Sequence, residues 1–176
     1  MTQFLEELQT HARVHNETFG MKVSLIAIGT KMPSWVQQGV EEYQKRIQSK
    51  LKFNLIEVPL ARRSKSQSIE QCIQKEGNEL LKMVPPDSWV IALDVAGTSI
   101  STEQLARKLT TFMAEGQNIS LLIGGPDGLD RSCLDKSKER WSFSALTLPH
   151  PLVRIVVIEQ LYRAFSMLNG HPYHRD

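Results

Sequence analysis

Three segments in the last third of the chain combine residue types that could bind a ligand and do chemistry on it. An apolar run ends in glycines at 121–128, a second ends in prolines at 142–151, and the polar tail 171–176 carries histidine, tyrosine and arginine. Where an apolar strand stops abruptly at glycine or proline, backbone N–H and C=O groups lose their ladder partners and become available to a ligand. Open α/β sheets bind ligands at such strand ends. We therefore expect the three segments to assemble one site.

The glycine-rich segment 121–128 does not fit several common chemistries. It lacks the Lys-Ser/Thr ending of a Walker A sequence, so phosphoryl transfer is not indicated. No expected strand is followed by the glycine pattern of a dinucleotide site, and the chain has no Gly-x-Ser-x-Gly elbow. His171 and His174 are three residues apart, but few other ligands lie nearby and Pro172 interrupts a helix. We therefore predict no metal site.

The composition is that of one compact domain in a reducing compartment. The chain has 176 residues, 41% of them hydrophobic, which is enough to build a substantial core. Cys72 and Cys133 are isolated, and we expect both to be free thiols. No apolar run approaches the roughly 18 to 20 residues of a membrane span, and the N-terminus has no apolar core of a secretory signal. We predict a cytoplasmic protein with no membrane partner.

The net charge of +2 argues against a nonspecific, charge-driven hold on nucleic acid. Basic residues do cluster locally, first at 62–65 and again at 131–140. Taken alone, each cluster is typical of solvated loops and helix faces. An RNA-phosphate role for either cluster depends on another feature that points to RNA.

From Met21 onward, short apolar runs alternate with amphipathic stretches. This pattern predicts an α/β fold with a mainly parallel sheet flanked by helices. Strands are expected near 22–28, 52–58, 88–94, 118–123 and 143–147. Helices are expected from Pro33 onward, over 68–83, after Ser101 and over 151–169. Residues 1–20 are mostly polar and aperiodic, so we predict an N-terminal extension outside the fold and a single domain over 21–176.

The last expected helix, 151–169, is apolar around nearly its whole circumference. Such a helix must be covered on every side, and a chain of this size has little left to cover the face turned away from the sheet. Self-association explains the pattern, and complete burial within one copy is the alternative. Glu159 and Arg163 have the spacing of a helical ion pair.

The three segments resemble the cofactor site of the SPOUT methyltransferases, and the match is closest to the bacterial ribosomal RNA large subunit methyltransferase H family. The resemblance covers Met21 to Asp176. It is carried by Gly-Thr-Lys-Met-Pro-Ser-Trp-Val at 29–36, Leu-Ile-Gly-Gly-Pro-Asp-Gly at 122–128, Ser-Ala-Leu-Thr-Leu-Pro-His-Pro-Leu-Val-Arg at 144–154, Glu-Gln-Leu-Tyr-Arg-Ala at 159–164 and His-Pro-Tyr-His-Arg at 171–175.

The resemblance implies a C-terminal trefoil knot, which no composition or periodicity would predict, because knots are rare in protein chains. It also implies a homodimer that uses S-adenosylmethionine to methylate N3 of a pseudouridine in helix 69 of 23S rRNA, on assembled 70S ribosomes. Two alternatives stay open. One is a SPOUT methyltransferase that acts on tRNA, and the other is a noncatalytic RNA-binding factor associated with the ribosome.

The cofactor positions that the resemblance implies fall on the first two segments and on the strand near 88–94. They are Leu93, Gly124, Phe143, Ser144, Ala145, Leu146, Thr147 and Leu148. A glycine at 124 would let the backbone approach the cofactor, and the leucines would offer apolar walls to an adenine.

The reaction needs a group that accepts the N3 proton or stabilises the developing anion. His174 is the candidate proton acceptor, Arg154 and Arg175 are candidate cationic stabilisers or phosphate contacts, and Tyr173 is a candidate stacking platform for an extruded base. Arg154 could also bridge subunits. We expect His150, between two prolines, to fix a turn.

Overall fold

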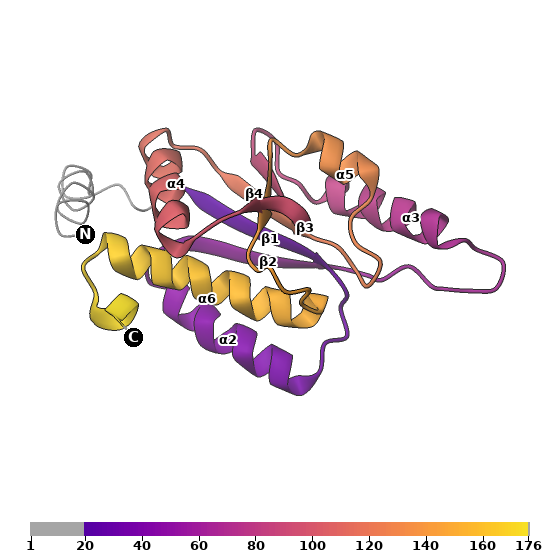
Figure 1. The fold of residues 1–176 in the computed structure, drawn as a ribbon, viewed down its shortest axis with the longest axis horizontal. Helices are drawn as coiled ribbons and strands as arrows, with labels where there is room; N and C mark the ends of the chain where they lie inside the picture. The colour runs from indigo at the N-terminus through magenta and orange to yellow at the C-terminus, as the bar shows by residue number, and fades with distance from the viewer. Residues whose placement is uncertain (1–19, 176) are drawn as a thin grey trace.

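The computed structural model describes residues 20–175, with the side chains of 20–173. The extension predicted over 1–20 falls outside this range, apart from Gly20. Five strands form one sheet in the order β2-β1-β4-β3-β5, and every neighbouring pair is parallel (Figure 1). The strands are β1 (Lys22–Ile28), β2 (Lys52–Val58), β3 (Trp89–Ser99), β4 (Ile119–Ile123) and β5 (Glu139–Ser142). The predicted α/β fold with a mainly parallel sheet flanked by helices is confirmed.

Helices cover both faces of the sheet (Figure 1). They are α2 (Ser34–Gln48), α3 (Ile69–Lys82), α4 (Thr102–Ala114), α5 (Arg131–Lys136), α6 (His150–Leu168) and the short 3-10 helix η1 (Pro172–Arg175). One core cluster joins α2, α4 and α6 to one face, and a smaller one joins α3 and α5 to the other. Strand side chains alternate between the two clusters, as Leu121 and Leu122 on β4 do, because successive residues of a strand point to opposite faces.

Local capping explains where two helices begin. The side chains of Ser68 and Ser101 each accept a hydrogen bond from the backbone N–H three residues on, and Gln71 and Gln104 each accept one from the backbone N–H of the cap. This reciprocal pair satisfies two N–H groups that would otherwise lack partners in the first turn. The predicted start after Ser101 is confirmed, and Pro33 is the residue just before α2.

The strand predicted over 143–147 is wrong. β5 occupies Glu139–Ser142, and the apolar residues after it form a loop. The Ser142 hydroxyl donates to the Ser144 carbonyl oxygen at 2.9 Å, and the Leu146 N–H donates to the Ser144 hydroxyl, also at 2.9 Å. These bonds turn the chain away from the sheet. The prediction followed apolar composition, but here the apolar side chains face a cavity, while the short edge strand carries charged residues.

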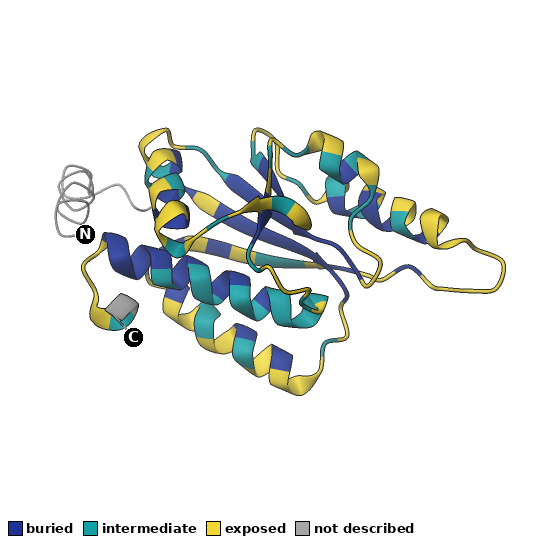
Figure 2. Cartoon of the chain, viewed as in Figure 1, coloured by how far each residue is buried: buried dark blue, intermediate teal, exposed yellow. Residues whose placement is uncertain are grey.

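Helix α6 is covered within one copy over its C-terminal half. Val157, Leu161 and Phe165 are fully or almost fully buried, and α2 and α4 pack on the helix. The N-terminal half is different, because Val153, Ile155 and their apolar neighbours are only half-buried (Figure 2). The alternative of burial within one copy therefore holds for the second half of the helix. The predicted ion pair is confirmed, with Arg163 2.8 Å from Glu159.

Both cysteines are buried free thiols, as predicted. Burial is the main cause that raises the pKa of the Cys133 thiol to about 11. Within residues 20–175, no helix is long and apolar enough to cross a membrane. The trefoil knot stays a prediction.

Candidate active site

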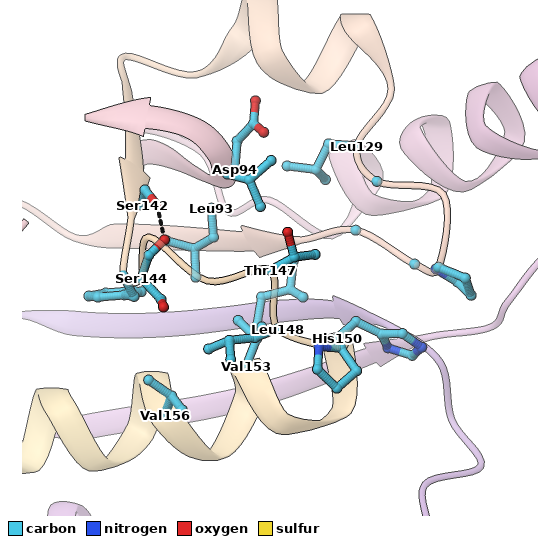
Figure 3. A pocket seen from close by; sticks show the side chains of 18 of the residues that line it. Leu93, Asp94, Leu129, Ser142, Ser144, Thr147, Leu148, His150, Val153 and Val156 are labelled. Carbon is cyan, nitrogen blue, oxygen red and sulfur yellow. Dashed lines mark hydrogen bonds between the residues drawn. The ribbon is translucent and has the colours of Figure 1, made fainter. Parts of the chain in front are cut away.

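A cavity of about 970 Å³ lies where the strands of the sheet end. Its walls come from residues 93–95 in the middle of β3, the glycine loop after β4, the loop 143–149 after β5 and the first two turns of α6 (Figure 3). The volume is at the upper end of the range of about 300 to 1,000 Å³ for small-molecule sites, and strand ends are where α/β sheets bind ligands. The first two sequence segments therefore meet in one cavity, as expected.

Seven of the eight predicted cofactor positions line this cavity. They are Leu93, Gly124, Phe143, Ser144, Leu146, Thr147 and Leu148. Ala145 is exposed and lies outside the lining. The lining also contains Val153 and Val156 of α6, which the sequence did not single out, because only the packing of α6 turns that face toward the loop (Figure 3).

Gly124 is required by the chain's own backbone. A Cβ at Gly124 would lie 2.4 Å from the carbonyl carbon and oxygen of Gly128 and 2.8 Å from the Leu129 nitrogen. Gly128 itself has a φ of +87°, in the left-handed region that favours glycine. The expected reason for Gly124 was close approach to a ligand. The structure provides another, which is that the glycine loop folds back on the end of β4.

An ion network anchored on the buried Glu76 of α3 holds the same loop. Arg63 contacts Glu76 and lies 2.6 Å from Asp127, which belongs to the glycine loop. Glu76 is only 3% exposed, and it also accepts the Ala61 N–H at 2.9 Å. Hydrogen bonds from Arg63 to Glu76 and then to Asp127 raise the pKa of Arg63 above its usual value. Arg63 therefore bridges α3 to the cavity loop and is not merely part of a solvated basic cluster.

Arg154 is fully buried and faces the ends of β1 and β2. Its guanidinium donates to the carbonyl oxygens of Ile28 and Gly29 at 2.6 and 2.7 Å, and it lies 2.5 Å from Glu57. Burial is the main cause that lowers the pKa of Arg154, and Glu57 opposes this effect. Arg154 is not part of the cavity lining. In this geometry it ties α6 to the sheet, so its predicted role in catalysis stays a prediction.

His150 is the first residue of α6 and lines the cavity. Its Nδ1 has no hydrogen-bond partner among the described residues. Burial, and then the charge of Arg154, lower the pKa of His150, which favours the neutral imidazole near neutral pH. His150 therefore contributes a neutral ring to the cavity wall, in addition to its predicted role in fixing a turn.

The polar tail packs at the other end of α6. The rings of Tyr173 and Tyr162 have centroids 4.7 Å apart, and the guanidinium carbon of Arg163 lies 4.8 Å from the Tyr173 ring centre. The Tyr173 hydroxyl donates to Glu159 at 3.2 Å. Burial raises the pKa of this hydroxyl, so it stays protonated. His174 and Arg175 belong to η1, and their side chains lie outside the described residues.

Within one copy, none of the tail residues whose side chains the structure describes lines the cavity. The cavity touches α6 only as far as Val156, whereas Tyr173 contacts the helix from Glu159 to Arg163. The 3-10 helix η1 lies beyond the C-terminal end of α6, whereas the cavity lies at the N-terminal end of this helix (Figure 1). The expectation that all three segments assemble one site is met for the first two, and for the tail it stays a prediction.

These features define an α/β protein with a small-molecule cavity at the exits of a parallel sheet, built from a glycine loop and a proline-bounded loop. Residues 21–174 match the family described as "Predicted SPOUT methyltransferase". The chain belongs to the SPOUT methyltransferases and, within them, to the ribosomal RNA large subunit methyltransferase H family.

Two relatives named ribosomal RNA large subunit methyltransferase H illustrate the match. The protein of Saccharophagus degradans is 55% identical over 155 residues, and that of Marinomonas sp. is 47% identical over 155 residues; each alignment covers 88% of this chain and 100% of the relative. A solved probable methylase family protein from Haemophilus influenzae superposes with a TM-score of 0.51 at 16% identity, covering 88% of this chain and 70% of that one. At this identity the superposition supports the fold alone.

Proposed function

We propose that this chain is a cytoplasmic homodimeric enzyme that transfers a methyl group from S-adenosylmethionine to N3 of a pseudouridine in helix 69 of 23S rRNA, on assembled 70S ribosomes. The observation that carries the proposal is the cavity at the sheet exits, because seven positions implied by the family resemblance line it together. The relatives' shared name supports an rRNA substrate.

The cavity residues fit S-adenosylmethionine. Leu93, Leu148 and Val153 offer apolar walls to an adenine, and the hydroxyls of Ser144 and Thr147 stand beside them (Figure 3). When bound, this cofactor supplies a methyl group already activated by its sulfonium. The chain must then align the methyl group with N3, exclude water and take up the N3 proton.

The tail could reach a cavity from a second copy. At the start of α2, Trp35 is 54% exposed. One turn later, Gly39 packs on Ile155 of α6, which is half-buried. This apolar face lies on the N-terminal half of α6, which also lines the cavity. If two copies pair their α6 helices in opposite directions about a two-fold axis, the tail of one copy comes near the cavity of the other. The proposed catalytic groups His174, Arg175 and Tyr173 would then come from the partner subunit.

The test of the proposed function is transfer of labelled methyl from S-adenosylmethionine to 70S ribosomes, separate subunits and naked 23S rRNA, all lacking the modification, and to tRNA. We expect label only in 70S particles, on a helix 69 pseudouridine. Label on tRNA would show the alternative SPOUT activity. Binding to ribosomes without any transfer would favour the noncatalytic factor. Either result would overturn the proposal.

Mixing two impaired variants tests the shared site. His174→Ala should lower turnover at least about 100-fold, because general-base catalysis contributes about that much or more. Gly124→Ala should bind the cofactor more weakly, so the assay uses S-adenosylmethionine well below the KM of the unaltered protein, where the variant's own turnover is low. Half of the dimers in an equal mixture carry one copy of each, and one of their two sites is then intact, so about a quarter of the unaltered activity should return. No recovery after verified subunit exchange would place the tail and the cavity in the same copy. Full turnover by His174→Ala would reject it as the base.

Asp127→Asn tests the network that holds the glycine loop. Removing the charge that faces Arg63 should weaken S-adenosylmethionine binding about three- to tenfold, with kcat at saturating cofactor nearly unchanged, because the loop is loosened while the other residues that line the cavity are unaltered. Titration calorimetry measures the affinity for S-adenosylmethionine, and initial rates at varied S-adenosylmethionine concentration give KM and kcat. Asp135→Asn, which removes an exposed carboxylate on α5 paired with Arg131, is the matched control. A large fall in kcat with unchanged KM would contradict a positioning role.

A further inference from the structure

A second groove, of about 640 Å³, lies between the end of β3, helix α4 and strand β5. Basic side chains from α4, from β5 and from the residue just before β5 line it, namely Arg107, Lys108, Lys138 and Arg140. The sequence separates them into a helix and the basic cluster 131–140, so only the fold brings them together. Lys138 and Arg140, which are half of that cluster, therefore line the same groove as Arg107 and Lys108 of α4.

The groove carries an excess of positive charge. Its lining contains four cations and one carboxylate, Glu139, which leaves a net charge of +3. Glu139 is held by Lys108 at 2.5 Å and by the indole N–H groups of Trp89 and Trp141 at 3.2 and 2.8 Å. Lys138 and Arg140 are both exposed. Arg140 lies 3.9 Å from Asp135 of α5 and donates to the Leu134 carbonyl oxygen at 3.4 Å, so its positive charge is only partly compensated at the surface.

The groove also offers neutral donors. The exposed hydroxyl residues Thr98 and Ser99 lie on its β3 side. Lysine and arginine together with serine and threonine hydroxyls are the side chains that proteins use to contact nucleic-acid phosphates. The same set of groups is poorly suited to an apolar partner.

The groove adjoins the cofactor cavity through one irregularity in the sheet. Trp141 is aligned with both Leu93 and Thr98 of β3, so the residues between them bulge out of the strand. Asp94 and Val95 of this bulge line the cavity, and Ala96 and Gly97 line the groove. A Cβ at Gly97 would lie 2.8 Å from the backbone of Arg140 and Trp141, so the bulge is held tightly against β5. The cavity and the groove therefore lie on either side of this bulge and share Trp141 in their linings.

We propose that the groove binds the phosphate backbone of the RNA strand that flanks the nucleotide placed in the cavity. The inference rests on the proposed function, since that function brings an RNA strand to the cavity. It explains how a chain with a net charge of only +2 holds RNA, because the charge that matters is gathered along one path beside the site. Affinity from such contacts depends on salt, because bound phosphates release their counterions.

The test is charge reversal at two exposed groove positions, Lys138→Glu with Arg140→Glu. The matched control is Arg131→Glu with Lys136→Glu, which makes the same change in net charge within the same basic segment but on α5, outside the groove. The groove variant should raise KM for ribosomes at least tenfold and keep its affinity for S-adenosylmethionine. Its log-log salt slope should be smaller by about 1.5, for two lost phosphate contacts at about 0.7 to 0.9 each. The control should stay within about threefold of the unaltered protein.

Equal effects in the two variants would mean that total charge alone matters, and an unchanged groove variant would mean that no phosphate lies there; both overturn the proposal. Photo-crosslinking from Lys138→p-benzoylphenylalanine gives a readout that does not need turnover. Crosslinks to 23S rRNA support the groove, and crosslinks only to an acidic ribosomal protein overturn it. If the unaltered protein transfers no methyl group, the proposed function fails, whereas the crosslinks still decide whether the groove contacts RNA.

Discussion

Gly124→Ala should weaken cofactor binding by about five- to 150-fold while the protein stays folded. The new methyl group would lie 2.4 Å from the backbone of Gly128, a distance that no side-chain rotation can relieve. The glycine loop must therefore move away from the end of β4, and this loop forms one wall of the cavity. Overpacking of this kind costs about 1 to 3 kcal/mol, which is about five- to 150-fold in affinity if the loop returns to its place on binding. Titration calorimetry with S-adenosylmethionine measures the loss.

Gly128→Ala is the control for this variant. It changes the same loop, and a Cβ at Gly128 meets nothing within 4 Å, but its φ of +87° is unfavourable for alanine. We expect a loss of about 1 kcal/mol in the unfolding free energy and a smaller loss of affinity than in Gly124→Ala. If Gly124→Ala bound the cofactor as well as the unaltered protein does, the glycine loop would not be part of the cofactor site.

Arg154→Ala should destabilise the fold more than either glycine substitution does. It removes the buried cation that satisfies the carbonyl oxygens of Ile28 and Gly29 and pairs with Glu57. Breaking a buried pair by removing one partner costs about 3 to 5 kcal/mol, and the partial exposure of Glu57, at 37%, favours the lower end. Denaturant unfolding should show a loss of about 3 kcal/mol. This is a large part of the stability of a domain of this size.

Methyl transfer distinguishes structural from catalytic roles of Arg154. If it ties α6 to the sheet, the folded fraction of Arg154→Ala should keep cofactor affinity within about tenfold, since its side chain does not line the cavity. Glu57→Gln, which keeps the buried cation and removes its charged partner, should show a smaller loss of stability. Unchanged stability together with lost turnover in Arg154→Ala would instead indicate a direct role in the reaction.

Most of the sheet could be predicted because the strands of a parallel sheet are covered on both faces. β1, for example, is a nearly continuous apolar run, which is visible without knowledge of any partner. The start of α4 was visible for a similar local reason, since Ser101 and Gln104 satisfy each other within one turn. The same reasoning failed for β5. This strand lies at the edge of the sheet and is less apolar than the central strands, whereas the apolar residues that follow it line the cavity.

The candidate site was likewise predictable from the sequence only in part. Positions within the two loop segments, such as Gly124 and Leu148, were found because their motifs are contiguous in sequence. Val153 and Val156 were not, since most residues of α6 are apolar and only helix packing decides which of them face the cavity. Arg63 was assigned to a solvated cluster for the same reason, as its partners Glu76 and Asp127 are distant in the chain.

The sequence by itself determined the family, the alternation of strands and helices, and the residue types that could hold a cofactor and move a proton. These depend on patterns within a few residues of one another. Only the tertiary structure decided that Arg154 faces the sheet, that the tail lies at the far end of α6 from the cavity of its own copy, and that a basic groove adjoins the cavity. The physical reason is that burial, charge pairing and shared cavities are set by which distant segments pack together, and local sequence does not encode that choice.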